Sequence, residues 1–176
     1  YHSYYDDIQV DIRSHHPNNS NSGPVLRFSL PFLPNPNTNM TDLYVPFNHF
    51  DQWCNAVFTY NGQVLSIYLD GQLVGDTAVV TQMDWDAGTG NEIFGGWNFK
   101  GLIDNVSFWS KTLDPSEIST YNFSCLPINS NNLEAYFKFE SGDGYDYTGN
   151  NHTGIMNNGS FIMSPFTPNQ TILLQT

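Results

Sequence analysis

Residues 53–75 read WCNAVFTYNGQVLSIYLDGQLVG, and this stretch gives the clearest indication of the fold class. Asn-Gly at 61–62 separates two runs rich in β-branched and aromatic residues, 53–60 and 63–69, and Asn-Gly in this setting is the strongest short signal for a β-hairpin. Asp-Gly at 70–71 then reverses the chain a second time. The stretch therefore predicts a three-stranded antiparallel meander.

Short apolar runs separated by Gly, Pro, Asn and Asp recur along the rest of the chain, which is typical of an all-β sandwich. The further strands are expected at 7–13, 25–30, 43–47, 101–109 and 133–140. Alternation in the last of these predicts that Leu133, Ala135, Phe137 and Phe139 point inward and that Glu134, Tyr136, Lys138 and Glu140 point outward. One short helix is expected up to about Tyr121, because Asp114-Pro115-Ser116-Glu117 supplies an N-cap, a first-turn proline and a capping-box glutamate.

The composition excludes several classes of function. The chain has 176 residues and a formal charge of -12, with 5 Lys and Arg against 17 Asp and Glu. Such an acidic chain lacks the basic surface that nucleic acids or anionic lipids require. No segment reaches the roughly 20 apolar residues of a membrane-spanning helix, so neither nucleic acid nor membrane insertion is expected.

The two cysteines, Cys54 and Cys125, have no CxxC partner, so a zinc site is not expected. A disulfide between them would close a loop of about 70 residues and would stabilise the fold by roughly 4 kcal/mol. Two unrelated buried thiols are the alternative.

Asn-x-Ser/Thr sequons are more frequent than chance predicts. In a eukaryotic protein they would carry glycans and lie on the surface, whereas in a bacterial protein their excess would follow from the Asn-rich composition. The predicted glycosylation sites are Asn18, Asn39, Asn122, Asn151, Asn158 and Asn169.

Three segments together resemble the laminin G-like modules of the concanavalin A-like lectin/glucanase superfamily. They are WCNAVFTYNG with YLDGQLVG (53–75), FKGLIDNVSFW (99–109) and LDPSEI (113–118). A fourth piece, 133–139 with the loop 142–154, is similar to the opening strand of this family but follows the helix. The resemblance implies a two-sheet antiparallel jelly-roll sandwich with one short helix. We therefore expect one laminin G-like domain over 1–176, with core motifs at 53–121, a linker at 122–132 and C-terminal strands at 133–176 that are permuted or swapped.

Asp104 is the most informative acid, because its predicted strand places it on an inward face. A carboxylate there is costly unless it is paired, hydrogen-bonded or bound to a cation, and five Lys and Arg offer few partners. The oxygen-rich loop at 142–154 offers Asp143, Asp146, Asn150 and Asn151, and calcium takes roughly six to eight oxygen ligands. Since the resemblance also implies a structural calcium near these motifs, we expect Ca²⁺ bound by Asp104, Asp146 and Asn150. The alternative is that Asp104 caps backbone N–H groups without a metal.

Sugar binding requires an exposed aromatic ring beside amide and carboxylate groups. The candidates in predicted loops are Trp85, Trp97, Tyr145 and Tyr147, whose alternative role is packing over the end of the sandwich. Catalysis is not expected, because the Glu-x-Asp-x-x-Glu motif of the β-glucanases in this superfamily is absent.

These observations predict a non-catalytic, secreted or cell-surface module that binds carbohydrate or mediates adhesion, with a structural calcium. Its expected partner is a glycan or glycoprotein surface. One alternative is a subunit of an extracellular filament or surface array, in which the strand at 133–139 or the tail at 167–176 adds to a neighbouring copy. The other alternative is an accessory module of a secreted enzyme.

Overall fold

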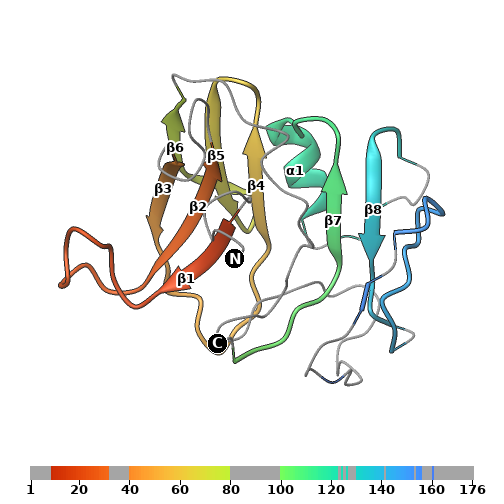
Figure 1. The fold of residues 1–176 in the computed structure, drawn as a ribbon, viewed down its shortest axis with the longest axis horizontal. Coiled ribbons are helices and arrows are strands. Elements are labelled where there is room, and N and C mark those ends of the chain that lie inside the picture. The colour runs from red at the N-terminus through yellow and green to blue at the C-terminus, as the bar shows by residue number, and fades with distance from the viewer. Residues whose placement is uncertain are drawn as a thin grey trace, which may run out of the picture. The chain divides into compact units, whose positions relative to one another are not determined.

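The computed structural model describes residues 9–31, 40–79, 100–122, 130–140 and 142–152, together with residues 124, 126, 154, 155 and 160. The chain divides into two compact units, Tyr1–Asn48 with Val57–Ile93, and His49–Ala56 with Phe94–Thr176. Figure 1 shows the elements, which are β1 (Gln9–Arg13), β2 (Val25–Pro31), β3 (Met40–Pro46), β4 (Ala56–Tyr60), β5 (Val64–Leu69), β6 (Gln72–Ala78), β7 (Val106–Trp109), α1 (Pro115–Tyr121) and β8 (Leu133–Phe137).

The predicted meander is confirmed, since β4, β5 and β6 form one three-stranded sheet in sequence order. At the first turn, the side-chain oxygen of Asn61 accepts hydrogen bonds from the backbone N–H groups of Gln63 and Val64, at 2.9 and 2.8 Å. At the second turn, Asp70 and Gly71 both have positive φ, 50° and 79°. This is the mirror-image geometry that matches the twist of two antiparallel strands, so local turn chemistry fixes the register of the sheet.

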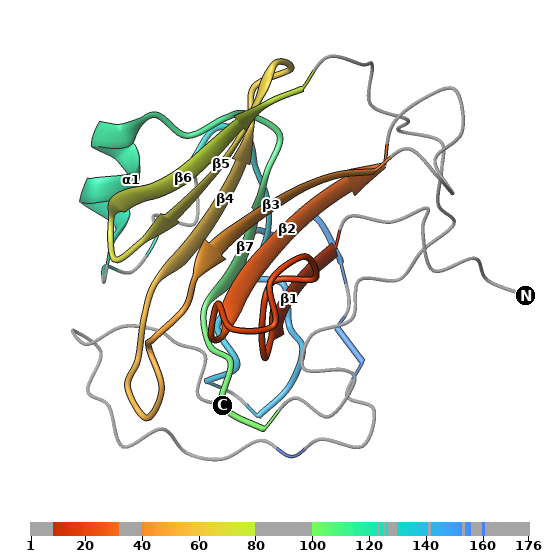
Figure 2. The ribbon, with the colours of Figure 1, turned by 90° about the vertical axis from the view of Figure 1, so that its left-hand side faces the viewer.

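The other three-stranded sheet has the order β1-β2-β3, and Figure 2 shows its strands side by side. The strand predicted at 25–30 is confirmed as β2, and its side chains Leu26, Phe28 and Leu30 are almost fully buried. The opposite side of β2 is buried as well, since Arg27 is 8% exposed. Its guanidinium donates to Asp11 at 2.8 Å. A carboxylate on β1 therefore compensates the buried charge of Arg27.

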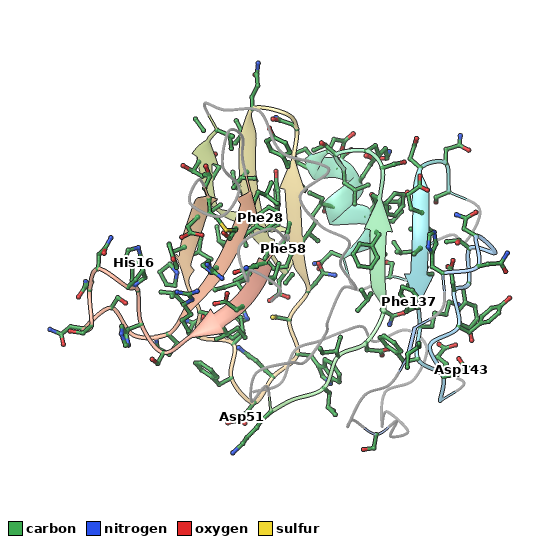
Figure 3. The ribbon with its side chains drawn as sticks, in the orientation of Figure 1. His16, Phe28, Asp51, Phe58, Phe137 and Asp143 are labelled. Atoms are coloured by element: carbon green, nitrogen blue, oxygen red, sulfur yellow. The ribbon has the colours of Figure 1, made fainter. Side chains whose placement is uncertain are left out.

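The two sheets of this unit meet through their apolar sides. The rings of Phe28 on β2 and Phe58 on β4 lie 5.3 Å apart (Figure 3). Gly75 on β6 lies so close to Val45 on β3 that a Cβ at Gly75 would come within 2.5 Å of the Val45 side chain. The predicted antiparallel β-sandwich with one short helix is therefore confirmed.

The second unit contains α1, whose capping box is formed as predicted. The Oδ1 atom of Asp114 accepts from the N–H groups of Ser116 and Glu117, at 2.8 and 2.9 Å, and a Glu117 carboxylate oxygen accepts from the N–H of Asp114 at 3.1 Å. Ile118 anchors the helix, because it is 1% exposed. Within the described residues, no helix is long and apolar enough to cross a lipid bilayer.

The strand predicted at 101–109 is shorter in the structure and begins only at Val106. Asn105 has a φ of 51°, and a left-handed residue cannot continue the extended backbone of a strand. Asp104 therefore precedes the strand, and Phe108 is 36% exposed rather than turned into a core. The prediction that Asp104 lies on an inward strand face is wrong for this reason.

β8 pairs antiparallel with β7 of the same chain, from Val106↔Phe137 to Trp109↔Leu133. Residues 133–137 thus pair within the chain, and the tail at 167–176 lies outside the described residues. Addition of either segment to a neighbouring copy stays a prediction. The single-domain boundaries and the permuted order stay predictions.

Tyr136 on β8 was predicted to point outward, but it is fully buried. The loop after β8 folds back over this strand, because the N–H of Tyr147 donates to the Tyr136 carbonyl at 2.9 Å. β8 is therefore covered on both sides at Tyr136, which simple alternation cannot predict, whereas Glu134 stays exposed. The alternation also ends early, since Phe139 has a φ of 59°.

Candidate functional site

The loop 142–152 is organised by the buried carboxylate of Asp146, which is 3% exposed. Its Oδ1 atom accepts hydrogen bonds from the N–H of Tyr136 at 3.1 Å, from the N–H of Thr148 at 3.0 Å and from the Thr148 hydroxyl at 2.7 Å. Its Oδ2 atom accepts from the N–H of His152 at 3.3 Å. One carboxylate thus ties the loop to β8 and closes it on itself.

The electrostatics of Asp146 agree with this structural role. Burial alone would raise the pKa of Asp146, but the hydrogen bonds from Thr148, Tyr136 and His152 outweigh burial and lower it. Donors that point at a carboxylate stabilise its ionised form. Asp146 therefore remains charged under neutral conditions and holds the loop as an anion.

Tyr145 is the exposed aromatic residue on this loop, with 59% of its surface accessible. Its ring lies edge-on to Tyr147, with the ring centroids 5.2 Å apart, and its N–H donates to Asp143 at 3.1 Å. Figure 3 shows Asp143 on the loop that follows β8. Tyr147 is half-buried and carries the Lys138 ammonium 4.9 Å from its ring centre. The loop therefore presents one aromatic ring, Tyr145, on a supported backbone.

Asp104 is half-buried, in the segment between Lys100 and β7. Burial raises the pKa of Asp104 above its usual value, the hydrogen bond from the N–H of Asn105 opposes this rise, and the nearby charge of Glu140 adds to it. The hydrogen bond from Asn105 is 2.9 Å long. Partial burial and the negative charge of Glu140 thus both disfavour ionisation of the Asp104 carboxyl.

Three of the five cations of the chain pair with other carboxylates. Arg13 and Arg27 both pair with Asp11, at 2.7 and 2.8 Å, and Lys111 pairs with Glu117. All five Lys and Arg fall within the described residues, and none of them forms an ion pair with Asp104 or Glu140 there. The Asp104–Glu140 pair therefore lacks a compensating protein cation in this part of the structure.

The calcium prediction named Asp104, Asp146 and Asn150, and it stays a prediction. Among the described residues, no three side chains of His, Cys, Asp or Glu converge on one point. Both oxygens of Asp146 already accept hydrogen bonds, and the Asn150 amide donates to the Glu134 carbonyl at 2.9 Å. Asp104 and Glu140 carry carboxylate oxygens of the kind that calcium takes.

Several predicted residues lie outside the described part of the chain, so their roles are untested: Trp85, Trp97, Cys125, Asn39, Asn158 and Asn169. Cys54 is buried, at 1% exposure, and its pairing with Cys125 stays a prediction. Asn18 and Asn151 are exposed, as glycan acceptors must be, whereas Asn122 is half-buried at the end of α1.

Two features of the structure were not predicted from the sequence. One is Glu140 as the neighbour of Asp104, which its outward position at the end of the predicted strand 133–140 could have suggested. The other is a hollow of about 360 Å³ between the β1–β2 loop and β3, lined in part by His16, Asn18 and Tyr44. The polar run HHPNNSNSGP at 15–24 marks that loop, but its folding over β3 depends on contacts distant in sequence.

Comparison with known proteins identifies the family. Residues 33–119 match the laminin G family model described as the concanavalin A-like lectin/glucanases superfamily. Neither the curated proteins nor the solved structures include a significant match to the chain. The matched segment contains β3 to β7 and most of α1, so it includes the meander and the capped helix that carry the resemblance. Residues 33–119 of this chain therefore belong to the concanavalin A-like lectin/glucanases superfamily, as a laminin G-like module.

Proposed function

We propose that this protein is a non-catalytic, secreted or cell-surface module that binds carbohydrate or mediates adhesion, and that calcium stabilises it. The observation that carries the proposal is Tyr145, an exposed ring on a loop whose backbone is fixed by Asp146. Laminin G-like modules are often carbohydrate-binding or adhesive, and this supports the same class of function.

An exposed aromatic ring can pack against the C–H face of a sugar ring, provided that hydrogen-bonding groups lie beside it. The loop supplies such groups, because Asp143, Asn150 and Asn151 are all exposed. The Asp146 hydrogen bonds hold the loop before a ligand arrives, which lowers the entropy cost of binding. Tyr145 and its polar neighbours therefore form the proposed sugar-contacting surface.

The proposal is tested on a glycan array with the full chain and two variants. Tyr145→Leu removes the aromatic face and should abolish binding, whereas Tyr145→Phe keeps the ring and should retain most of it. Equal binding by the wild type and Tyr145→Leu would contradict the role of Tyr145. If the wild type binds no glycan and sediments as oligomers, the assembly alternative is supported instead.

We further propose that calcium binds at Asp104 with help from Glu140. Calcium would neutralise two neighbouring carboxylates that no Lys or Arg of the described structure pairs with, and partial burial of Asp104 makes this neutralisation more favourable. Asp146 can join such a site only if its present hydrogen-bond donors turn away.

Calcium at about 100 times its dissociation constant would stabilise the fold by roughly 2.7 kcal/mol, which corresponds to about 5–10 °C in Tm for a chain of this size. A chelator should therefore lower the Tm of the wild type and leave that of Asp104→Asn unchanged. Asp76→Asn, an exposed acid on β6, is the matched control and should behave like the wild type. A chelator without effect on wild-type Tm would overturn the calcium proposal.

The absence of the glucanase motif from the sequence supports a binding role. If hydrolysis of a glycan that binds were detected, and if it persisted in highly purified protein, the non-catalytic part of the proposal would be wrong. An accessory role beside an enzyme is compatible with the same binding surface.

A further inference from the structure

The turn between β4 and β5 carries an asparagine directly before a glycine, Asn61-Gly62. Figure 1 shows the two strands that the turn joins, which are neighbours in one sheet. Asn61 and Gly62 are both exposed, so water reaches them. Because glycine has no side chain, it leaves the backbone nitrogen next to Asn61 accessible. The other Asn-Gly pair of the chain, 158–159, lies outside the described residues.

The side-chain amide of Asn61 is polarised by two hydrogen-bond donors. Its Oδ1 atom accepts from the N–H groups of Gln63 and Val64, at 2.9 and 2.8 Å. Fixed donors that point at a carbonyl oxygen stabilise the negative charge that develops on this oxygen when a nucleophile attacks the carbon. The two N–H groups therefore activate the Cγ atom of Asn61 toward attack.

The attacking nitrogen and the leaving group are both accessible. Within the described part of the chain, the N–H of Gly62 donates to no acceptor, and neither does the side-chain NH₂ of Asn61. A Cβ placed at Gly62 would meet no atom within 4 Å, so the space beside this residue is open. Because Gly62 directly follows Asn61, attack on Cγ is intramolecular and requires no encounter of two molecules.

We propose that Asn61 is a site of spontaneous deamidation, which the β4–β5 turn promotes. The nitrogen of Gly62 forms a bond to Cγ of Asn61 and gives up its proton. The bond from Cγ to Nδ2 breaks, and Nδ2 leaves with this proton as ammonia. Water then opens the resulting succinimide. Cleavage between the ring nitrogen and Cγ gives aspartate, whereas cleavage between the ring nitrogen and the main-chain carbonyl carbon gives isoaspartate.

The two products should differ in their effect on the hairpin. In aspartate, a carboxylate oxygen accepts from the same two N–H groups, and such charge-assisted bonds are stronger than neutral ones. Isoaspartate adds one carbon atom to the main chain, which disturbs the hydrogen bond of 3.3 Å from the N–H of residue 61 to the Val64 carbonyl. Aspartate should therefore retain the turn and add one negative charge, whereas isoaspartate should loosen it.

The test compares the native chain with a synthetic peptide of residues 58–65, FTYNGQVL, which has the same covalent neighbours but no folded turn. Both are incubated at mildly alkaline pH, and mass spectrometry of peptides follows the gain of about one dalton at Asn61. A fixed donor of this kind contributes about 10²–10³ in rate in enzyme sites that exclude water, and solvent exposure reduces the effect. Asn61 should therefore convert roughly two- to tenfold faster in the native chain than in the peptide.

Two variants and one internal control separate the parts of the proposal. Gln63→Pro removes one donor, because proline has no N–H, and should slow conversion in the folded chain but not in the peptide. Asn61→Asp reproduces the aspartate product and should have a Tm equal to or above that of the wild type. Asn21, which is exposed but precedes Ser22 rather than a glycine, should keep its amide in the same sample.

A rate in the native chain equal to or below that in the peptide would overturn the inference, because the turn would then not promote the reaction. Equal conversion of Asn21 and Asn61 would overturn it as well. If Gln63→Pro does not fold, the comparison of the native chain with the peptide still decides. None of these results depends on glycan binding or on calcium, so the proposed function and the deamidation of Asn61 stand or fall separately.

Discussion

Removal of one buried hydroxyl group tests how the second unit is held together. The Tyr136 hydroxyl donates to the side-chain oxygen of Asn105 at 2.6 Å, and Tyr136 is fully buried. This bond joins β8 to the residue just before β7, where the chain adopts a φ of 51°. Tyr136→Phe deletes the hydroxyl and keeps the ring, so it removes the bond with little change in packing.

The expected cost follows from the position of the two partners. A net hydrogen bond contributes about 0.5–1.5 kcal/mol, and a buried acceptor left without a donor adds its own desolvation cost. Because Asn105 is only half-buried, water can partly replace the lost donor. We therefore expect Tyr136→Phe to lower the free energy of unfolding by about 1.5 kcal/mol, or the Tm by about 3–6 °C.

A double-mutant cycle isolates the contribution of this bond. Asn105→Gly is the second change, because glycine adopts a positive φ without strain. Urea unfolding of the wild type, both single variants and the double variant should give a coupling energy of about 1 kcal/mol. Additivity within about 0.3 kcal/mol would mean that the bond contributes nothing, and would refute the reasoning.

Three further experiments probe other contacts. Gly75→Ala places a Cβ 2.5 Å from the Val45 side chain, so it should destabilise the fold by about 1–3 kcal/mol in urea unfolding. If the Gly75→Ala variant were as stable as the wild type, the two sheets would not meet at this position. Gly144→Ala puts a Cβ into the Gly154 carbonyl, whereas the Cβ of Gly154→Ala comes no closer than 3.1 Å to Gly144. Amide hydrogen exchange in the loop 142–152 should therefore accelerate more in Gly144→Ala than in Gly154→Ala. The reverse order would contradict this geometry. The pKa of Asp146 is lowered in the folded protein, so its ionised form stabilises the fold above the unfolded-state pKa near 4, and this contribution is lost as the pH falls through the folded-state pKa. Asp146→Asn should therefore weaken the decrease of Tm between about pH 5 and pH 2. An unchanged pH dependence of the Tm would refute this role of Asp146.

The turns and the helix could be predicted from the sequence because their causes are local. Asn61 bonds to the two N–H groups that follow it within three residues, and the Asp114–Glu117 capping box spans four. Neither needs a distant partner to take its conformation. The burial of Tyr136 could not be predicted in this way, because the loop 142–152 that covers it begins several residues later and is held by Asp146.

The candidate sites likewise divide into features with local causes, which the sequence predicts, and features that depend on distant contacts, which it does not. The sequence identified Tyr145 as a loop aromatic and Asp146 as an important acid, since both types of residue are conspicuous in a polar loop. It assigned Asp104 to a strand because alternation continues through Asn105 in the sequence, and only the backbone shows the positive φ that interrupts it. The hollow beside Tyr44 needs the β1–β2 loop to lie over β3, so it depends on tertiary packing.

The limits of the family match differ from the limits of the sheets. The matched segment 33–119 includes β3 but excludes β2, its antiparallel partner, and it includes β7 but excludes β8. A fragment cut at these limits would expose one unpaired edge in each unit, and unpaired edges promote aggregation. The residues on either side are therefore part of the fold, and those after β8 also carry the proposed sugar-contacting surface around Tyr145. The segment that identifies the family thus forms the scaffold, while the flanking loop after β8 supplies most of the side chains that would determine which sugar is bound.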